Sequence, residues 1–246
     1  REGHEMSSME VITTGGAPVP PELVRKIRDR LGCSLQSAFG QTEASPMICL
    51  NHDDVRFDDI CYSAGQPLPH TSVSIRHPET GGVLDVGEVG EICAKGYNVM
   101  IGYHNNPDAT HAAIDEDHWL HTGDLGKLDQ RGFIQVTGRV KDMIIRGGEN
   151  HFPAEIENTL MESPQVAEVA VVGIPDEKWG EVIAAFIRTA EDMPWDADNL
   201  KSFCRSHLSP QKTPSIWRHV HAFPLTGSGK IQKFKIREKY LSGDYE

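Results

Sequence analysis

The hydrophobic pattern of the first part of the chain predicts one helix followed by one strand. Residues 20–31 place apolar side chains three and four positions apart behind a pair of prolines, which is typical of an amphipathic helix. The apolar stretch 34–39 predicts a strand that leads into the loop 40–43. Because open α/β sheets bind ligands at the ends of their strands, this loop is a candidate ligand-binding segment.

The pattern changes near residue 65. Short segments in which apolar and polar residues alternate are separated by turns rich in glycine and proline, such as 78–82 and 129–132. Alternation with a period of two, with turns at short intervals, is typical of antiparallel strands joined in hairpins. We therefore expect a small antiparallel β-barrel or sandwich over about 65–140.

Helical and strand-like patterns mix after residue 140. Pro153 begins a helical pattern, and 233–241 predicts a final helix. Between them, 166–174 and 182–187 are apolar enough to form buried strands.

Together these patterns give a fold class that combines α/β and α+β architecture. The chain has 246 residues, which is enough for two ordinary domains. We expect residues 1–140 to form the end of a large α/β domain, with the antiparallel subdomain inside it. Residues 141–246 are expected to form a second, small α+β domain.

Composition narrows the functional classes. The formal net charge of −12 argues against a general nucleic-acid binder, which needs a basic face. No apolar run approaches the ~20 residues of a membrane span, and no signal peptide is visible. The five cysteines are scattered and none are spaced as Cys-x-x-Cys, which argues against a zinc site or a disulfide framework and suits a reducing cytoplasm. We expect a cytoplasmic protein without a transmembrane segment.

The segment 224–230, which ends in Gly-Ser-Gly-Lys, is the first candidate for chemistry. A P-loop requires Gly-x-x-x-x-Gly-Lys-Ser/Thr, but Pro224 stands at the first position and Ile231 at the last. Since no hydroxyl is placed to hold magnesium, the P-loop interpretation is rejected. Lys230 therefore remains either a catalytic cation on a loop flanked by glycine or an ordinary solvated charge.

Three further segments carry candidate groups. Asp124 follows Gly123, and an ionised carboxylate there could accept both hydrogen bonds of a ribose diol or could cap a turn. Arg139 places a positive charge ahead of a short apolar strand. Gly147 and Gly148 would let the backbone approach a ligand closely, or would form a simple turn.

The loop 39–43 and the glycine pair at 15–16 are the last candidates. Glycine residues beside Phe39 could admit a flat base against its ring. Glu43 could face magnesium, which prefers carboxylate and phosphate oxygens. The alternative is a helix-entry turn and an ordinary loop.

The order of these segments carries more information than any of them alone. One succession contains Gly-Gly-Ala-Pro at 15–18, Phe-Gly-Gln-Thr-Glu at 39–43, Gly-Glu-Val-Gly-Glu-Ile at 87–92, Thr-Gly-Asp-Leu at 122–125, Gly-Arg-Val-Lys-Asp at 138–142 and Leu-Thr-Gly-Ser-Gly-Lys-Ile at 225–231. From about residue 10 to 241 this succession resembles the adenylate-forming superfamily of acyl-CoA synthetases, luciferases and peptide-synthetase adenylation domains. Segments 143–150 and 152–157 look most like fatty acyl-CoA synthetases of the medium-chain type.

The resemblance implies a reaction in two steps. A carboxylic acid, here a fatty acid, and ATP first give an acyl-adenylate and pyrophosphate with the help of Mg²⁺. Coenzyme A then displaces AMP and gives the thioester. In this family the small C-terminal domain rotates between the two steps on a hinge residue, which matches Lys141 here.

The resemblance also implies a role for individual residues. It assigns catalysis to Lys230, Thr42 and the magnesium ligand Glu43; nucleotide binding to Gly16, Ala17, Pro18, Phe39, Gly40, Asp124 and Arg139; and coenzyme A binding to Gly147 and Gly148. Phe39 stands where the family more often has Tyr, so the position loses a hydroxyl but keeps an aromatic face. Lys230 is expected to act in adenylation and not in thioester formation.

One departure from the family pattern matters for activity. The family has a phosphate loop rich in Ser, Thr and Gly, which lies upstream and has no counterpart here, and the chain begins at Arg1. We therefore expect the C-terminal portion of a longer protein, with an N-terminal half as its partner and little adenylation by this chain alone. Two alternatives stay open: another adenylating enzyme, such as an aryl acid ligase or a luciferase-like oxidase, or a non-catalytic fragment that binds a nucleotide or a partner.

Overall fold

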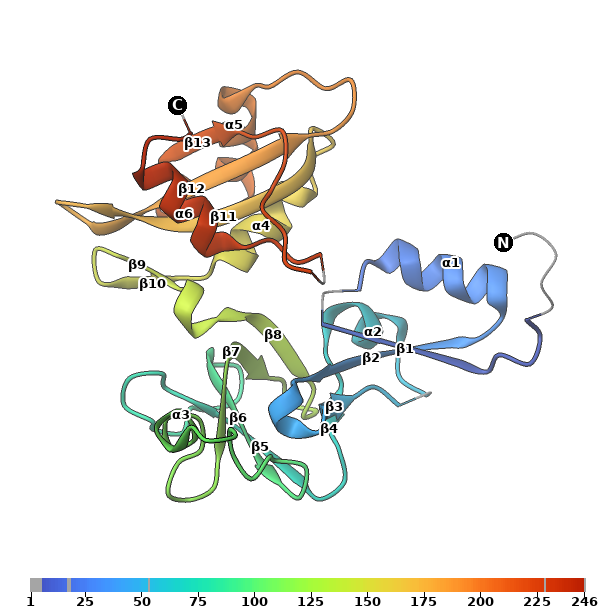
Figure 1. The fold of residues 1–246 in the computed structure, drawn as a ribbon. Helices are drawn as coiled ribbons and strands as arrows, with labels where there is room; N and C mark the ends of the chain where they lie inside the picture. Colours follow the sequence, from blue (N-terminus) through green and yellow to red (C-terminus); the bar gives the residue numbers. More distant parts are fainter. Residues whose placement is uncertain (1–5, 17–18, 53, 228, 246) are drawn as a thin grey trace. The chain divides into compact units, whose positions relative to one another are not determined.

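In the computed structural model the chain divides into two compact units, residues 1–137 and 138–246. The structure describes residues 6–16, 19–52, 54–227 and 229–245. The division falls close to the change of hydrophobic pattern at residue 140. Each unit has its own sheets, which Figure 1 draws as arrows, and its own buried clusters.

The first unit begins with a parallel strand–helix–strand arrangement. β1 (Val11–Gly15) pairs in parallel with β2 (Ser34–Gly40), and α1 (Pro21–Leu31) connects them. β3 (Met47–Leu50) and β4 (Gln66–Pro67) continue this sheet antiparallel, in the order β1-β2-β3-β4. The helix and the strand predicted from the hydrophobic pattern are confirmed to within one residue at each end.

The apolar face of α1 explains its position. Val24 is buried in a small cluster with Leu35 of β2 and Ile60 of α2 (Phe57–Tyr62), and Ile27 packs against the same cluster. The helix ends at Gly32, which has a left-handed backbone (φ 67°) that favours a residue without a Cβ atom.

The antiparallel sheet of the first unit is open. Its strands, in order, are β5 (Thr71–Arg76), β6 (Gly90–Gly96), β7 (Leu120–Leu128) and β8 (Ile134–Arg139). The sequence correctly predicted antiparallel hairpins, in a barrel or a sandwich. No pairing among the described residues joins β8 to β5, so this sheet is not a closed barrel. This sheet need not close on itself, because its apolar face is already covered: Ile92 and Leu120 share one buried cluster with Phe39 and Ile48 of the first sheet.

Short helices fill two connections of the first unit. A single 3-10 turn, η1 (Thr42–Ala44), follows β2. α3 (Pro107–Ala113) begins after Asn106, whose side chain accepts a 3.1 Å hydrogen bond from the amide of Ala109 and so caps the helix.

The second unit is built on one five-stranded sheet. β10 (Glu149–His151), β9 (Ile144–Arg146), β12 (Gly180–Thr189) and β11 (Val166–Asp176) lie in that order, and β13 (Ile216–His219) pairs in parallel with β12. Around it lie α4 (Pro153–Met161), α5 (Ala197–His207), α6 (Lys233–Leu241) and the single turns η2 (Val140–Asp142) and η3 (Pro210–Lys212). The final helix has the bounds that the sequence predicted, and Pro153 begins its helix as expected.

Both faces of this sheet are covered, which explains its long apolar strands. Val171 of β11 packs in one buried cluster with residues of α4 and α5, including Ile156 and Leu200. Its neighbour Val172 packs in another cluster with Ile236 of α6. A strand that is buried on both faces has a continuous run of apolar residues in its sequence, and not an alternation of apolar and polar residues.

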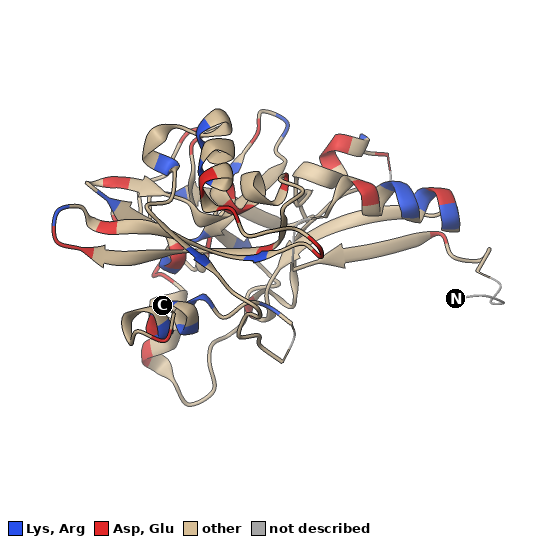
Figure 2. Cartoon of the chain, turned by 90° about the horizontal axis from the view of Figure 1, so that it is seen from above, with Lys and Arg blue, Asp and Glu red and all other residues tan. Residues whose placement is uncertain are grey.

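Lys and Arg residues are interspersed with Asp and Glu residues over both units (Figure 2). On α1, for example, Glu22 pairs with Lys26 at 2.7 Å. Within the described ranges, no helix combines the length and the apolar character that a membrane crossing requires. All five cysteines are free and buried.

Candidate functional site

The residues assigned roles by the sequence fall in both units. Gly16, Phe39, Gly40, Thr42, Glu43 and Asp124 belong to the first unit, and Arg139, Lys141, Gly147, Gly148 and Lys230 belong to the second. Ala17 and Pro18 lie outside the described residues. Gly16 directly follows β1 and has a positive φ of 80°, so it supports a turn at the end of that strand.

Phe39 and Gly40 end β2, but each has a structural role there. Phe39 is only 9% exposed and belongs to the buried cluster between the two sheets of the first unit. Most of its ring is therefore covered by protein, and a base could stack only on the small remainder. A Cβ atom on Gly40 would lie 1.9 Å from the carbonyl oxygen of Pro46, so close packing of backbone accounts for this glycine.

Glu43 is held in place by two contacts with the segment before α3. Its Oε1 atom accepts a 2.7 Å hydrogen bond from the hydroxyl of Tyr103, and its backbone carbonyl accepts one from the amide of Met100 at 2.8 Å. The hydrogen bond to Glu43 raises the pKa of Tyr103, because the carboxylate accepts from the neutral phenol. Thr42 is exposed beside Glu43 on η1.

The donor set around Glu43 fits magnesium in part. Mg²⁺ in proteins is commonly held by one or two carboxylates together with substrate phosphates and water. Glu43 supplies one carboxylate, which Tyr103 orients through a single lone pair of Oε1. The remaining ligands would then come from the nucleotide phosphates and water.

Asp124 lies on a bulge within β7. Leu125 pairs with Glu91 of β6, while His121 pairs with Cys93, so three residues of β7 face only Ile92 on the neighbouring strand. The middle residue of the three, Gly123, has a φ of +70°, which explains the glycine before the aspartate. Asp124 itself is 9% exposed.

Glu91 is a residue of this site to which the sequence assigned no role. Its Oε1 atom accepts a hydrogen bond from the amide of Gly123 at 3.0 Å, and its Oε2 atom lies 2.8 Å from Nδ1 of His121. Glu91 lies within the motif segment Gly-Glu-Val-Gly-Glu-Ile. Nothing in the sequence, however, indicates that its side chain contacts Gly123, which is 32 positions away.

Among the described residues, Glu91, Cys93 and His121 are close enough together to be considered as metal ligands. Burial, with the nearby charge of Glu91, raises the pKa of the Cys93 thiol to about 12. A metal-binding cysteine must be a thiolate. Both oxygens of Glu91 already serve the backbone of Gly123 and the ring of His121, so hydrogen bonding accounts for this group without a metal.

Lys230 is exposed on a small hairpin of the second unit. Leu225 and Ile231 form an antiparallel bridge that closes it. Thr226 holds the lysine in two ways: its amide donates to the carbonyl of Lys230 at 2.8 Å, and its Oγ1 accepts from the amide of Lys230 at 3.0 Å. The backbone of the lysine is therefore fixed while its side chain is presented to solvent.

The hairpin leads directly into α6, which is anchored to the body of the unit. The Nζ atom of Lys233 pairs with Oε1 of Glu157 at 2.7 Å, and the same carboxylate oxygen accepts the amide of Val171 at 2.7 Å. Because both charged side chains are largely buried, this pair fixes the exit of the Lys230 loop on the sheet.

Gly147 and Gly148 form the two-residue turn between β9 and β10. Both have positive φ values, of 61° and 83°, as a type I′ hairpin requires. A Cβ atom on Gly147 would approach the ring of Trp179 to 3.0 Å, whereas one on Gly148 would meet no atom within 4 Å. Only Gly148 therefore leaves open space at the tip of the hairpin.

Arg139 and Lys141 lie at the start of the second unit. Arg139 ends β8, and Lys141 lies in η2, directly after it. Both are exposed. The expected hinge position is thus within a few residues of the point where the chain divides into its two units.

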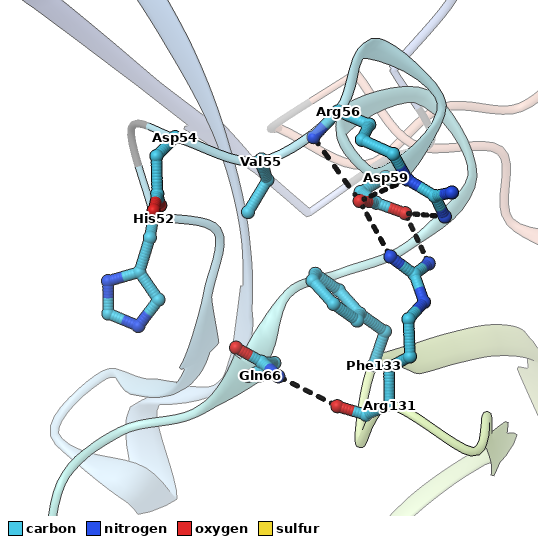
Figure 3. A pocket seen from close by; sticks show the side chains of 8 residues that line it. All are labelled: His52, Asp54, Val55, Arg56, Asp59, Gln66, Arg131 and Phe133. Atoms are coloured by element: carbon cyan, nitrogen blue, oxygen red, sulfur yellow. Dashed lines mark hydrogen bonds and ion pairs between the residues drawn. The ribbon is translucent and has the colours of Figure 1, made fainter.

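A cavity of about 620 Å³ in the first unit was not anticipated from the sequence. Its lining residues are His52, Asp54, Val55, Arg56, Asp59, Gln66, Arg131 and Phe133 (Figure 3). Arg131 binds the Asp59 carboxylate through both terminal nitrogens, at 3.1 and 2.5 Å, and Arg56 adds a further contact at 3.3 Å. Hydrogen bonds from Arg131, and then from Arg56, hold the pKa of Asp59 well below its usual range. Both arginine side chains of this cavity are therefore already bound to a protein carboxylate.

Taken together, the parallel β1–α1–β2 arrangement, the antiparallel sheet that carries Asp124 and the separate unit that carries Lys230 form a fold that is shared with solved adenylate-forming enzymes. Two family models match the chain: "AMP-binding enzyme" over residues 1–104 and "AMP-binding enzyme C-terminal domain" over residues 155–230. The chain belongs to this family of AMP-binding enzymes.

Curated relatives in the family are acyl-CoA synthetases. The chain is 41% identical over 241 residues to the putative acyl-CoA synthetase YngI of Bacillus subtilis, covering 98% of this chain and 44% of YngI. It is 43% identical over 237 residues to the mitochondrial medium-chain acyl-CoA ligase ACSF2 of Bos taurus, covering 96% of this chain and 38% of that ligase. The chain therefore spans less than half the length of these relatives.

Solved structures of similar fold include nucleotide complexes. ATP-bound MatB from Rhodopseudomonas palustris matches with a TM-score of 0.85 at 33% identity, over 93% of this chain and 45% of MatB. The o-succinylbenzoate CoA synthetase MenE of Bacillus subtilis, in complex with its acyl-adenylate, matches with a TM-score of 0.82 at 36% identity, over 92% of this chain and 46% of MenE.

Proposed function

We propose that this chain supplies the C-terminal nucleotide-handling part of an AMP-forming acyl-CoA synthetase that acts on fatty acids. The observation that carries the proposal is that the two units hold different candidate groups. Asp124 lies on a bulge held by Glu91 in one unit, and Lys230 lies on a fixed hairpin in the other. Similarity to a medium-chain acyl-CoA ligase supports the choice of acid.

In the first step, an oxygen of the acid attacks the α-phosphorus of ATP and pyrophosphate leaves. Two negatively charged groups approach each other, so a nearby cation lowers the barrier. Lys230 would supply that cation, while Glu43 would hold Mg²⁺, which offsets charge on the phosphates when bound. Asp124 would accept the hydrogen bonds of the ribose diol, and Arg139 would assist it.

In the second step, the thiol of coenzyme A loses its proton and attacks the acyl carbon, the bond to the AMP phosphate breaks, and AMP leaves. This step needs room for a thiol and no longer needs Lys230. Gly148, with open space where a Cβ atom would lie, would line the path of the pantetheine chain. Movement of the second unit about Lys141 would exchange one loop for the other.

The test must provide the region that the relatives carry ahead of the matched part. The N-terminal region of YngI can be joined to this chain, since the two share 41% identity over the matched length. We expect acid-dependent ATP–pyrophosphate exchange with medium-chain fatty acids from the joined protein, and little or none from the 246-residue chain alone. Equal activity of the chain alone would contradict our expectation that it depends on an N-terminal half.

Two variants make this test specific. Lys230→Ala should lower the exchange rate by about 10²–10³ while leaving thioester formation from a supplied acyl-adenylate intact. Lys235→Ala, an exposed lysine on α6, is the matched control and should change neither step. Equal loss of both steps in Lys230→Ala would contradict the assigned role.

A second candidate function comes from the structural comparisons. They include MenE and the amide bond synthetase McbA of Marinactinospora thermotolerans at 34–36% identity, so another adenylate-forming ligase remains an alternative. Aromatic acids in the same exchange assay separate the two. Exchange with aromatic but not fatty acids would favour the alternative, and nucleotide binding without any exchange would favour a non-catalytic role.

A further inference from the structure

The bulge that carries Asp124 is held by side chains as well as by the strand ladder. Thr122, Gly123 and Asp124 face a single residue, Ile92, so the ordinary ladder cannot hold all three. Thr122 compensates in part, because its Oγ1 donates to the carbonyl of Ile92 at 2.6 Å and accepts from the amide of Asp124 at 3.1 Å. Bulges of this kind commonly aim a side chain at a functional site.

Glu91 holds the middle of the bulge. Its Oε1 accepts the amide of Gly123, the residue with the left-handed backbone, at 3.0 Å. Residues with a Cβ rarely adopt that backbone, and a glycine is conformationally free unless a partner restrains it. The backbone amide one residue before Asp124 is therefore fixed by a carboxylate from the neighbouring strand.

The carboxylate of Glu91 is itself fixed by a chain of polar groups. Its side chain is 11% exposed, and its Oε2 lies 2.8 Å from Nδ1 of His121. Because a carboxylate only accepts, Nδ1 is the donor. Nε2 of His121 lies 3.5 Å from Asp115, which in turn pairs with Arg76 at 3.1 Å. A largely buried carboxylate requires such partners, so its position is strongly determined.

We propose that Glu91 is a positioning residue for Asp124: it holds the amide of Gly123 and thereby fixes the bulge that offers the Asp124 carboxylate to a ribose diol. This inference rests on the proposed nucleotide-binding role of Asp124. Glu91 touches no substrate in this scheme and acts only through the bulge.

Substitution by glutamine separates the positioning role from the charge. Glu91→Gln keeps an Oε1 acceptor for Gly123, and its amide nitrogen can donate to His121 in the tautomer that carries its proton on Nε2. Glu91→Ala removes the acceptor altogether. Glu91→Leu also removes it but fills most of the volume, and replaces Glu91→Ala in every measurement if that variant does not fold.

The first measurement is amide hydrogen exchange at Gly123, followed by NMR in the 246-residue chain without a ligand. We expect exchange at Gly123 to become at least about tenfold faster in Glu91→Ala, which corresponds to loss of a hydrogen bond to a charged group, and to stay near its original rate in Glu91→Gln. Unchanged protection of Gly123 in Glu91→Ala would overturn the proposal.

The second measurement is titration of the joined protein, with and without the same substitutions, with AMP and with 2′,3′-dideoxy-AMP. We expect the unsubstituted joined protein and its Glu91→Gln variant to prefer AMP. Glu91→Ala should lose most of that preference, to the level of Asp124→Ala, and the double variant should lose no more. Affinity for the dideoxy nucleotide should not change. A purely structural role would weaken both nucleotides equally and would overturn the proposal.

Different results would contradict the role of Asp124 and the role of Glu91. If the unsubstituted joined protein shows no preference for AMP over the dideoxy nucleotide, the proposed role of Asp124 is wrong, and the role of Glu91 falls with it. If the preference exists and Glu91→Ala keeps it, only the positioning role is wrong.

Discussion

The hydroxyl of Tyr103 donates a 2.7 Å hydrogen bond to Oε1 of Glu43, across 60 positions of the sequence. It joins the turn after β2 to the segment before α3 and orients the carboxylate proposed to hold Mg²⁺. The sequence motifs did not indicate a role for Tyr103, because its partner Glu43 lies in a different segment of the chain.

The first prediction concerns the pKa of Tyr103, which this hydrogen bond changes. The hydrogen bond to Glu43 raises the pKa of Tyr103, so the neutral phenol persists to higher pH than usual. In Glu43→Ala the accepting carboxylate is lost, and the pKa of Tyr103 should fall toward the ordinary tyrosine value of about 10. Ultraviolet titration of phenolate, compared with the same titration of Tyr103→Phe, isolates this one group. An identical difference curve before and after Glu43→Ala would contradict the prediction.

A second prediction concerns Asp59 and acid stability. Arg131 and Arg56 lower its pKa in the folded protein, so the pair contributes stability that is present above the unfolded pKa of about 3.9 and is lost as pH falls below it. Asp59→Asn should reduce the free energy of unfolding by about 1–3 kcal/mol at pH 7 and should flatten its pH dependence below pH 4.

Urea denaturation at a series of pH values measures this effect. Asp54→Asn, an exposed residue that lines the same cavity, is the matched control and should change the free energy of unfolding by less than about 0.5 kcal/mol. The difference in the free energy of unfolding between Asp59→Asn and the unsubstituted protein should shrink as the pH falls. A difference that grows on acidification would contradict the prediction.

A third prediction separates two kinds of motif glycine. In Gly40→Ala the new Cβ would lie 1.9 Å from the carbonyl oxygen of Pro46, so the strand end must move, at a cost of about 1–3 kcal/mol or more. In Gly148→Ala the Cβ meets no atom, and only the left-handed backbone costs about 1–2 kcal/mol. In thermal unfolding, Gly40→Ala should therefore lower the Tm more than Gly148→Ala does. The reverse order would count against the steric argument.

A fourth prediction concerns the hairpin of Lys230. Thr226→Ala removes the Oγ1 atom that accepts the amide of Lys230, while Thr226→Ser keeps it. In the joined protein, Thr226→Ala should slow adenylation by about 3–10-fold, because a neutral hydrogen bond is worth about 1 kcal/mol, and should leave thioester formation from supplied acyl-adenylate unchanged. Thr226→Ser should behave like the unsubstituted protein. A loss of both steps in Thr226→Ala would indicate general disorder of the second unit instead.

Local patterns predicted the elements well where local physics decides them. The final helix, the apolar strand that begins at Val166 and the helix that begins near Pro21 all have the starts that their spacing predicts, to within one residue. The turn at Gly147 and Gly148 follows from the backbone freedom of two adjacent glycines. Each of these features depends on residues within a few positions of one another.

The sequence by itself determined the order of the motifs, the element types and the family, because periodicity, turn chemistry and motif succession are written along the chain. Only the tertiary structure decided that Phe39 is mostly buried, that Glu91 holds the bulge before Asp124, and that Asp59 binds Arg131 across 72 positions. It also decided that the antiparallel sheet is open, since a neighbouring sheet covers its apolar face. Burial and pairing across such distances depend on how elements pack, and packing is not expressed in the local pattern of any one segment.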